Sequence, residues 1–250
     1  MKASTQLIST FAKVYGGHCV TESNTTRPSP QVLREALVDL TPERRITGRN
    51  LSKADVLFYR VGERRVAVKD YGARSFLARH TVGRLLVGRE CRAYERARGA
   101  PGLVPFLGRL GPFTMATGWI DAVPLADLPG GAVSAEIFDR LEAVIAELHR
   151  RGVALADLHH RDVLVGENGS VHVVDLAVAH VLGPRPGPLR LRLFARLAAQ
   201  DRLAAARMRA RFTGRSEDEA LAAIDPATRR FWEAGRRIKA LWDRLRGKRA

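Results

Sequence analysis

The alternation of apolar and polar residues predicts a β-hairpin near the start of the folded part of the chain. Residues 54–61 (ADVLFYRV) and 64–71 (RRVAVKDY) are rich in β-branched and aromatic side chains and are separated by Gly62 and Glu63. Two such runs across a short glycine-containing turn are typical of antiparallel strands. Lys69 stands near the end of the second run. We therefore expect a lysine at the end of a β-strand.

Apolar positions at helical spacing predict two helices, with one more strand between them. Residues 76–98 carry Leu85, Leu86, Tyr94 and Ala97 at helical spacing and stop before Gly99. A strand is expected in GPFTMATGWI, residues 111–120. Residues 134–151 begin with a serine cap, have acidic residues in the first turn and basic residues in the last, and predict the clearest helix of the chain.

The second half of the chain continues with a short hairpin and then helices. Strands are expected at 163–165 and 171–174, around the turn sequence GENGS, and the region from 185 onward is predicted to be helical. The order of elements indicates an α+β fold. We expect a polar leader over 1–30, a β-rich part over 31–118 and a helical part over 119–250.

Composition adds a charge asymmetry to this pattern. The 250 residues carry a formal net charge of +16, and residues 185–250 alone hold 18 basic against 7 acidic side chains. A surplus of this kind favours anionic partners. Only six of the 42 basic residues are lysines, so an arginine-rich codon bias is the alternative explanation. No aromatic-rich basic motif accompanies the charge, and we do not expect a nucleic-acid partner.

Cysteine content and hydropathy indicate where the protein is located. Cys19 and Cys91 form no metal-binding or disulfide pattern, which fits a reducing compartment. The first residues have no unbroken apolar core typical of a signal peptide, and no run approaches the roughly 18 apolar residues of a spanning helix. We expect a cytoplasmic protein that could bind the inner membrane peripherally without crossing it.

Three aspartates near the second hairpin carry the candidate chemistry. Asp157 and Asp162 lie five residues apart in LADLHHRDVLV, and Asp175 follows the apolar run VHVV. Upstream, Lys69 ends the run VAVK, and Glu90 lies on the helix that follows. Phosphoryl transfer from ATP needs a cation on the phosphates, oxygen ligands for Mg²⁺ and an acceptor for the substrate proton. Turn capping is the structural alternative for any single aspartate.

These motifs, over residues 45–180, resemble the protein-kinase-like superfamily. Within it the chain is similar to bacterial lipopolysaccharide core kinases, including the Kdo kinase group, and to the small RIO-type kinases. The resemblance implies a two-lobed fold, with a small β-rich N-lobe and a helical C-lobe that has no full activation segment, and it implies ATP and Mg²⁺ as cofactors. It further implies roles for five side chains: Lys69 on the phosphates, Glu90 as its partner, Asp157 as the catalytic base, and Asp162 and Asp175 on the metal.

The chain departs from the family pattern at several positions. Leu155 replaces the loop histidine, Asp162 replaces a metal-binding asparagine, and Leu176 follows Asp175 where the family has phenylalanine. The stretch TGRNLSKAD has a single glycine where phosphate-covering loops usually have several. Both catalysis and a noncatalytic pseudokinase therefore remain open. If the chain is catalytic, substitution of Lys69 or Asp175 should abolish transfer and leave the fold intact.

The sequence gives weaker signals for the adenine and substrate sites than for the ionic residues. Thr117, Gly118 and Trp119 occupy the position of the hinge between the lobes and are our candidates for adenine contacts. No Ala-Pro-Glu triplet follows Asp175, which favours a small or lipid-linked sugar hydroxyl as acceptor, with atypical serine/threonine kinase activity as the alternative. Leucines and arginines alternate from residue 189, which indicates either a basic helix on an anionic membrane or a helix packed on the domain.

Overall fold

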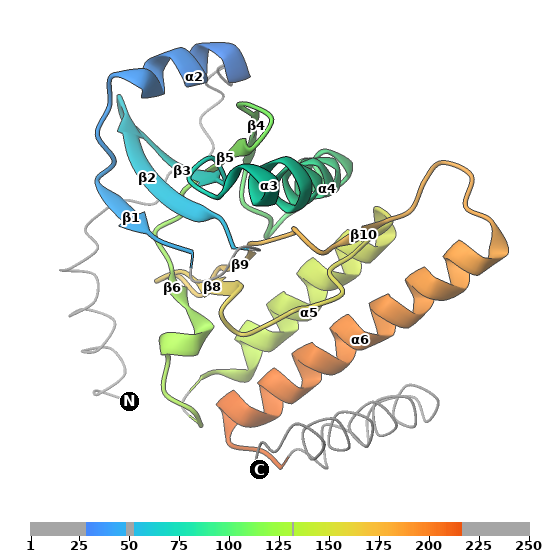
Figure 1. Ribbon diagram of the computed structural model, residues 1–250. Coiled ribbons are helices and arrows are strands. Elements are labelled where there is room, and N and C mark those ends of the chain that lie inside the picture. The colour runs from blue at the N-terminus through green and yellow to red at the C-terminus, as the bar shows by residue number, and fades with distance from the viewer. Residues whose placement is uncertain (1–28, 49–52, 132, 217–250) are drawn as a thin grey trace, which may run out of the picture.

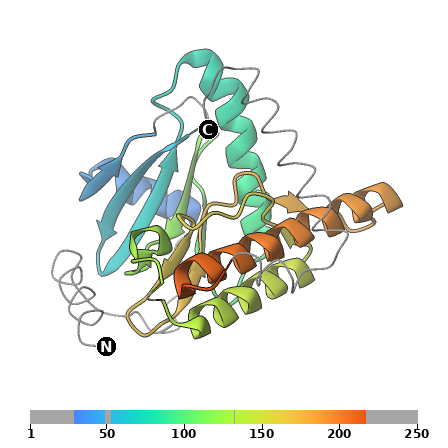
Figure 2. The ribbon, with the colours of Figure 1, turned by 90° about the horizontal axis from the view of Figure 1, so that it is seen from below.

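The computed structural model describes residues 29–48, 53–131 and 133–216 (Figure 1). Within these ranges the chain is a mixed α+β structure, which confirms the predicted fold class. A five-stranded sheet and the helix beside it form one part, and two long helices with short strands form the other. Figure 2 shows the two long helices running side by side beneath the sheet.

The five-stranded sheet is antiparallel and contains the predicted hairpin. The hairpin turns at Gly62, which has a φ of +61°. Lys69 pairs with Val56 on one side and Met115 on the other, so it lies on the central strand. The strands, in their order across the sheet, are β1 (Arg44–Ile46), β2 (Asp55–Val61), β3 (Arg64–Asp70), β5 (Thr114–Gly118) and β4 (Phe106–Arg109).

The predicted helix over 76–98 is three consecutive elements in the structure. α3 (Phe76–Ala78) is followed by a π-helical turn, η1 (Arg79–Gly83), and then by α4 (Arg84–Arg96). A π-turn adds a residue to the turn, so apolar positions before and after it no longer share one face. Tyr94 and Ala97 are buried as the spacing predicts, whereas Leu85 is 58% exposed. The prediction was wrong for Leu85, which lies on the same helix nine residues before Tyr94 and therefore about half a turn away from the buried face.

The second part of the chain begins after β5 and contains the clearest predicted helix. Ser134 caps α5 by accepting a hydrogen bond from the Glu136 backbone N–H. Six large apolar residues at helical spacing are buried along one face of this helix: Ile137, Phe138, Leu141, Val144, Ile145 and Leu148. The elements are β6 (Val123–Pro124), η2 (Leu125–Asp127), α5 (Ala135–Arg150), β7 (Val153–Ala154), β8 (Val163–Val165), β9 (Val171–Val173), β10 (His180–Val181) and α6 (Pro188–Thr213).

One apolar core joins the two parts, and a smaller one lies on the other face of the sheet. The main core combines Tyr94 of α4 and Met115 of β5 with Phe138 of α5 and Leu176. The smaller core lies beneath α2 (Pro30–Val38), which covers that face through Leu33 (Figure 1). The sheet is therefore covered on both faces.

Several sequence-based expectations concern residues outside the described ranges. They are the polar leader up to residue 28, the central residues 49–52 of the loop with a single glycine, and the basic tail from 217 to 250. The helical prediction for the region after 185 is confirmed for α6. In the part of the chain that the structure describes, no helix is long and apolar enough to cross a membrane.

Candidate active site

Three predicted side chains from three distant elements meet in one ionic cluster. The Lys69 Nζ atom on β3 lies 2.6 Å from Glu90 Oε1 on α4 and 3.0 Å from Asp175 Oδ1, which follows β9. The predicted pair of Lys69 and Glu90 is therefore present. Asp175 completes a cluster that joins the sheet, α4 and the second part of the chain.

Local sequence patterns explain why these side chains point toward one another. Val66 and Val68 face the smaller core, so the alternation of a β-strand directs Lys69 to the opposite face. On α4, Glu90 lies three residues after Val87 and four before Tyr94, and all three are buried on one helix face. The helix thereby presents a carboxylate, 1% exposed, to the strand lysine.

Lys69 and Asp175 are held in their charged forms. Burial by itself would lower the pKa of Lys69, but the Glu90 and Asp175 carboxylates outweigh it and raise that pKa above its ordinary value. Burial also acts to raise the pKa of Asp175, and Lys69 more than offsets this, so the Asp175 pKa lies below its ordinary value. Burial raises the pKa of Glu90, and Lys69 opposes that shift. Lys69 is thus a fixed cation beside an ionised Asp175.

The backbone around Asp175 is strained and held by polar contacts. Asp175 and Ala156 have φ angles of 65° and 68°, and they are the two non-glycine residues with positive φ in the described ranges. Such conformations cost free energy and cluster at functional sites. The Leu176 N–H donates to Glu90 Oε1 at 3.3 Å, and the Tyr94 hydroxyl accepts from the Asp175 N–H. The helix that orients Lys69 therefore also positions the aspartate.

Asp162 lies beside Asp175, and Asp157 is exposed. The Val174 N–H donates to the Asp162 carbonyl at 2.9 Å, which brings the two loops together. Burial, together with the Asp175 carboxylate, raises the pKa of Asp162 to about 6. No group of three His, Cys, Asp or Glu side chains within the described residues is arranged to hold a metal ion. Two carboxylates nevertheless suit Mg²⁺, which usually binds one or two of them together with waters and substrate phosphates.

The raised pKa of Asp162 predicts a pH-dependent stability. Because the folded pKa of about 6 lies above the unfolded value near 3.8, the folded protein loses stability as pH rises between them. Asp162→Asn removes this cost and should add about 1–2 kcal/mol to the free energy of unfolding at pH 8 without Mg²⁺. At pH 4 the variant and the wild type should be equally stable. Urea unfolding at both pH values measures the difference.

The exposed Asp157→Asn provides the matched control, since it removes the same charge from the same loop. This control should show little of the pH-dependent gain. An Asp162→Asn stability gain that is equal at pH 4 and pH 8 would contradict a half-buried Asp162 with a raised pKa.

A residue that the sequence did not single out holds the loop that carries Asp157. Asp201 on α6 is 1% exposed and accepts hydrogen bonds from the backbone N–H groups of Leu155 and Ala156, each at 2.8 Å. His149 Nε2 on α5 lies 2.8 Å from the same carboxylate. Leu155 is itself buried in the main core. An acidic residue in the apolar stripe of α6 was the one sequence signal for this role.

A small open pocket lies next to the ionic cluster. Lys69, Asp175 and Lys53 line it, together with Ala54, Val56, Tyr71 and Ala177. Its volume of about 90 Å³ is below that of ordinary small-molecule pockets, which begin at about 300 Å³. The pocket is large enough for a phosphate group and too small for a whole nucleotide.

The three hinge candidates lie apart from this pocket and make contacts within the protein. The N–H groups of Gly118 and Trp119 donate to the carbonyls of Pro105 and Arg65, at 2.7 and 3.1 Å. Thr117 lies within β5, between β3 and β4. The Trp119 ring packs on Phe58 and beneath the Arg65 guanidinium. The two N–H groups are therefore not available as donors to adenine in this structure.

Comparison with known proteins adds no family assignment. A scan against protein-family models and a search of curated proteins found no match to this chain. The geometry of the candidate site is thus the basis for a functional proposal.

Proposed function

We propose that this protein is an ATP- and Mg²⁺-dependent phosphotransferase of two-lobed, protein-kinase-like fold. The contact of Lys69 with both Glu90 and Asp175, beside a phosphate-sized pocket, is the observation that carries the proposal. Kinases use a strand lysine, a helix glutamate and a metal-binding aspartate in this combination. An ion pair needed only for stability would not require a strained aspartate backbone at the mouth of a pocket.

Each side chain has a stated task in the proposed reaction. Lys69 binds the phosphates that do not react, and Glu90 keeps its ammonium group oriented. Asp162 and Asp175 would hold Mg²⁺, which supplies positive charge to the phosphate oxygens when it is bound. Asp157 accepts the proton of the substrate hydroxyl while that oxygen bonds to the γ-phosphorus. The bond from this phosphorus to the bridging oxygen breaks, and ADP leaves.

The acceptor that we propose is a hydroxyl of a lipid-linked sugar at the cytoplasmic face of a membrane. The chain continues from Asp175 through β10 directly to α6, and this short connection leaves little chain to form a platform for a peptide. The first turns of α6 carry Leu189, Leu191 and Leu193, which are 79%, 47% and 45% exposed. Exposed leucines interleaved with arginines are typical of helices that lie on anionic bilayers.

Binding to vesicles tests this location. Each arginine near an anionic surface contributes about 1 kcal/mol, so Arg190→Gln with Arg192→Gln should weaken binding to phosphatidylserine vesicles about thirtyfold at low salt. Binding should decrease further at physiological ionic strength, where the Debye length is about 8 Å. Co-sedimentation measures the bound fraction. Arg34→Gln with Arg84→Gln removes the same charge from exposed positions elsewhere and should bind as the wild type does.

If the two double variants show the same vesicle-bound fraction, or if binding does not change with salt concentration and lipid charge, α6 is not a membrane-binding helix. The leucines would then be an ordinary exposed end of a helix. The proposed phosphotransferase activity does not depend on this result.

The central experiment measures ATP binding with and without Mg²⁺, followed by release or transfer of the γ-phosphate. We expect Mg²⁺-dependent binding and turnover by the wild type. Asp175→Asn should reduce turnover at least a thousandfold, since asparagine tolerates the positive φ angle but removes the charged metal ligand. ATP binding without turnover would indicate a pseudokinase, and absence of binding would overturn the proposal.

A further inference from the structure

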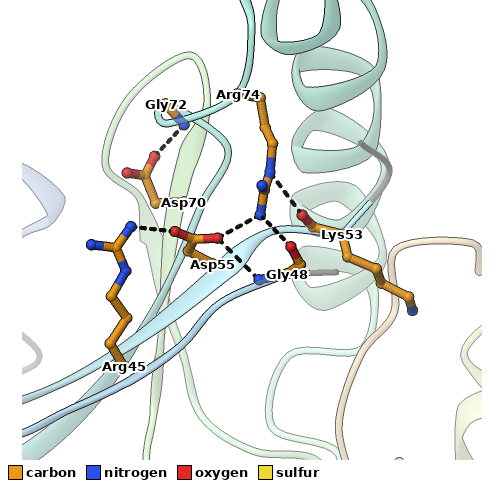
Figure 3. Close-up of polar contacts among 7 residues, drawn as sticks. All are labelled: Arg45, Gly48, Lys53, Asp55, Asp70, Gly72 and Arg74. Atoms are coloured by element: carbon orange, nitrogen blue, oxygen red, sulfur yellow. Dashed lines mark hydrogen bonds and ion pairs between the residues drawn. The ribbon is translucent and has the colours of Figure 1, made fainter. Parts of the chain in front are cut away.

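A buried carboxylate clamps the base of the loop between β1 and β2 (Figure 3). Asp55 is 2% exposed and accepts hydrogen bonds from Arg45 Nη2 and Arg74 Nη2 at 2.5 Å each, and from the Gly48 N–H at 3.0 Å. Burial alone would raise the pKa of Asp55, but these donors lower it, so the carboxylate is ionised. Its two cationic partners come from opposite sides, one from β1 and one from the turn after β3.

Arg74 also joins the two ends of the loop to each other. Its guanidinium donates to the Lys53 carbonyl at 3.1 Å and to the Gly48 carbonyl at 3.2 Å. A Cβ atom on Gly48 would lie 2.3 Å from the Lys53 carbonyl oxygen, so only glycine permits this approach. Asp70 stabilises the turn that carries Arg74, because its carboxylate accepts a hydrogen bond from the Gly72 N–H at 2.7 Å. These contacts fix the position of the Lys53 backbone.

Figure 3 shows that the Lys53 side chain extends away from Asp55. The same side chain lines the pocket. Its Nζ atom lies 4.0 Å from Asp175 Oδ2, and its side chain is 66% exposed. Lys53 lines the same pocket as Lys69, and the two lysines approach different oxygens of the Asp175 carboxylate. An exposed pair at this distance is weak, at about 0–1 kcal/mol, so an anion in the pocket can readily replace it.

We propose that Lys53 is a second phosphate-binding cation of the site, and that Asp55 and Arg74 are positioning residues for it. The inference rests on the proposed function, because it assigns the ligand of the pocket to the phosphate chain of a nucleotide. Loops that cover phosphates usually bind them through the backbone N–H groups of several glycines, and this loop has one glycine. A lysine side chain would supply the attraction for phosphate instead. Asp55 and Arg74 do not line the pocket, so the clamp acts only through the backbone of residue 53.

The test compares the binding of MgATP with that of adenosine, by isothermal titration calorimetry. Lys53→Met keeps the length of the side chain and removes its charge, and we expect MgATP affinity to fall about tenfold. Adenosine affinity should stay unchanged, since it has no phosphate. Arg34→Met is the matched control because it removes an exposed positive charge on α2, and it should bind both ligands as the wild type does.

The positioning role is tested with Arg74→Met, alone and combined with Lys53→Met. If Arg74 acts through Lys53, it should weaken MgATP binding severalfold in the wild-type background and cause no further loss in the Lys53→Met background. Thermal unfolding of each variant gives the folded fraction, so that binding is compared per folded molecule. Equal losses in both backgrounds would show that Arg74 only stabilises the loop.

The outcomes separate this inference from the function on which it rests. Wild-type protein that binds MgATP, together with Lys53→Met that binds it equally well, would overturn the role of Lys53 alone. Wild-type protein that does not bind MgATP would overturn the proposed function and this inference with it. An equal loss of MgATP and adenosine affinity in Lys53→Met would also overturn the inference, because the effect would not depend on phosphate.

Discussion

Lys69→Met should lower the free energy of unfolding by about 3–5 kcal/mol and remove MgATP binding. The loss of stability is expected because Glu90, 1% exposed, would remain as a buried carboxylate without its cation. This revises the expectation from sequence that Lys69 can be replaced without affecting the fold. Urea unfolding followed by circular dichroism measures the first effect, and calorimetry with MgATP measures the second.

A double variant separates the two roles of Lys69. Lys69→Met with Glu90→Met replaces the buried pair by apolar side chains, and such replacements are often neutral or stabilising. We expect this variant to recover most of the stability and none of the MgATP binding. A single Lys69→Met variant as stable as the wild type would contradict a charged Glu90 in the core. Recovery of binding in the double variant would contradict the phosphate-binding role of Lys69.

Asp201→Ala should lower the free energy of unfolding by about 3–5 kcal/mol, or the melting temperature by about 10 °C. The substitution leaves the buried N–H groups of Leu155 and Ala156 without an acceptor and removes the partner of His149. Ala156 would also lose the hydrogen bond that helps to hold its positive φ angle. Differential scanning calorimetry measures the change.

The same substitution should reduce phosphate transfer about a hundredfold per folded molecule, because Asp157 directly follows the released segment and a shift of about 1 Å in a catalytic group has this effect. Asp139→Ala provides the control: it removes an aspartate that pairs with Arg209 on the surface of α5 and α6, and such pairs contribute about 0–1 kcal/mol. If Asp201→Ala changes stability no more than this control does, the loop is held by other contacts.

Secondary structure and the buried face of each element were largely predictable, because both depend on residues that are close together in the sequence. The alternation in 64–71 places Lys69 on a strand and directs it away from Val66 and Val68. The cap at Ser134 and the six apolar positions of α5 specify a helix and its buried face without any distant contact. Helical spacing also places Glu90 on the face that Tyr94 buries, and its pairing with Lys69 was expected from the family resemblance.

The tertiary structure decided those features that join residues far apart in sequence. Asp201 accepts from backbone groups 45 and 46 residues away, and a single acidic residue in a helix does not indicate such partners. Arg74 and Asp55 are separated by 19 residues, and their contact depends on how the turn after β3 folds back on the sheet. The π-turn before α4 and the internal hydrogen bonds of Gly118 and Trp119 likewise result from packing. Local sequence sets backbone conformation and which side chains are apolar, whereas the partner of a buried polar group is set by which distant segments the packed core brings within hydrogen-bond distance.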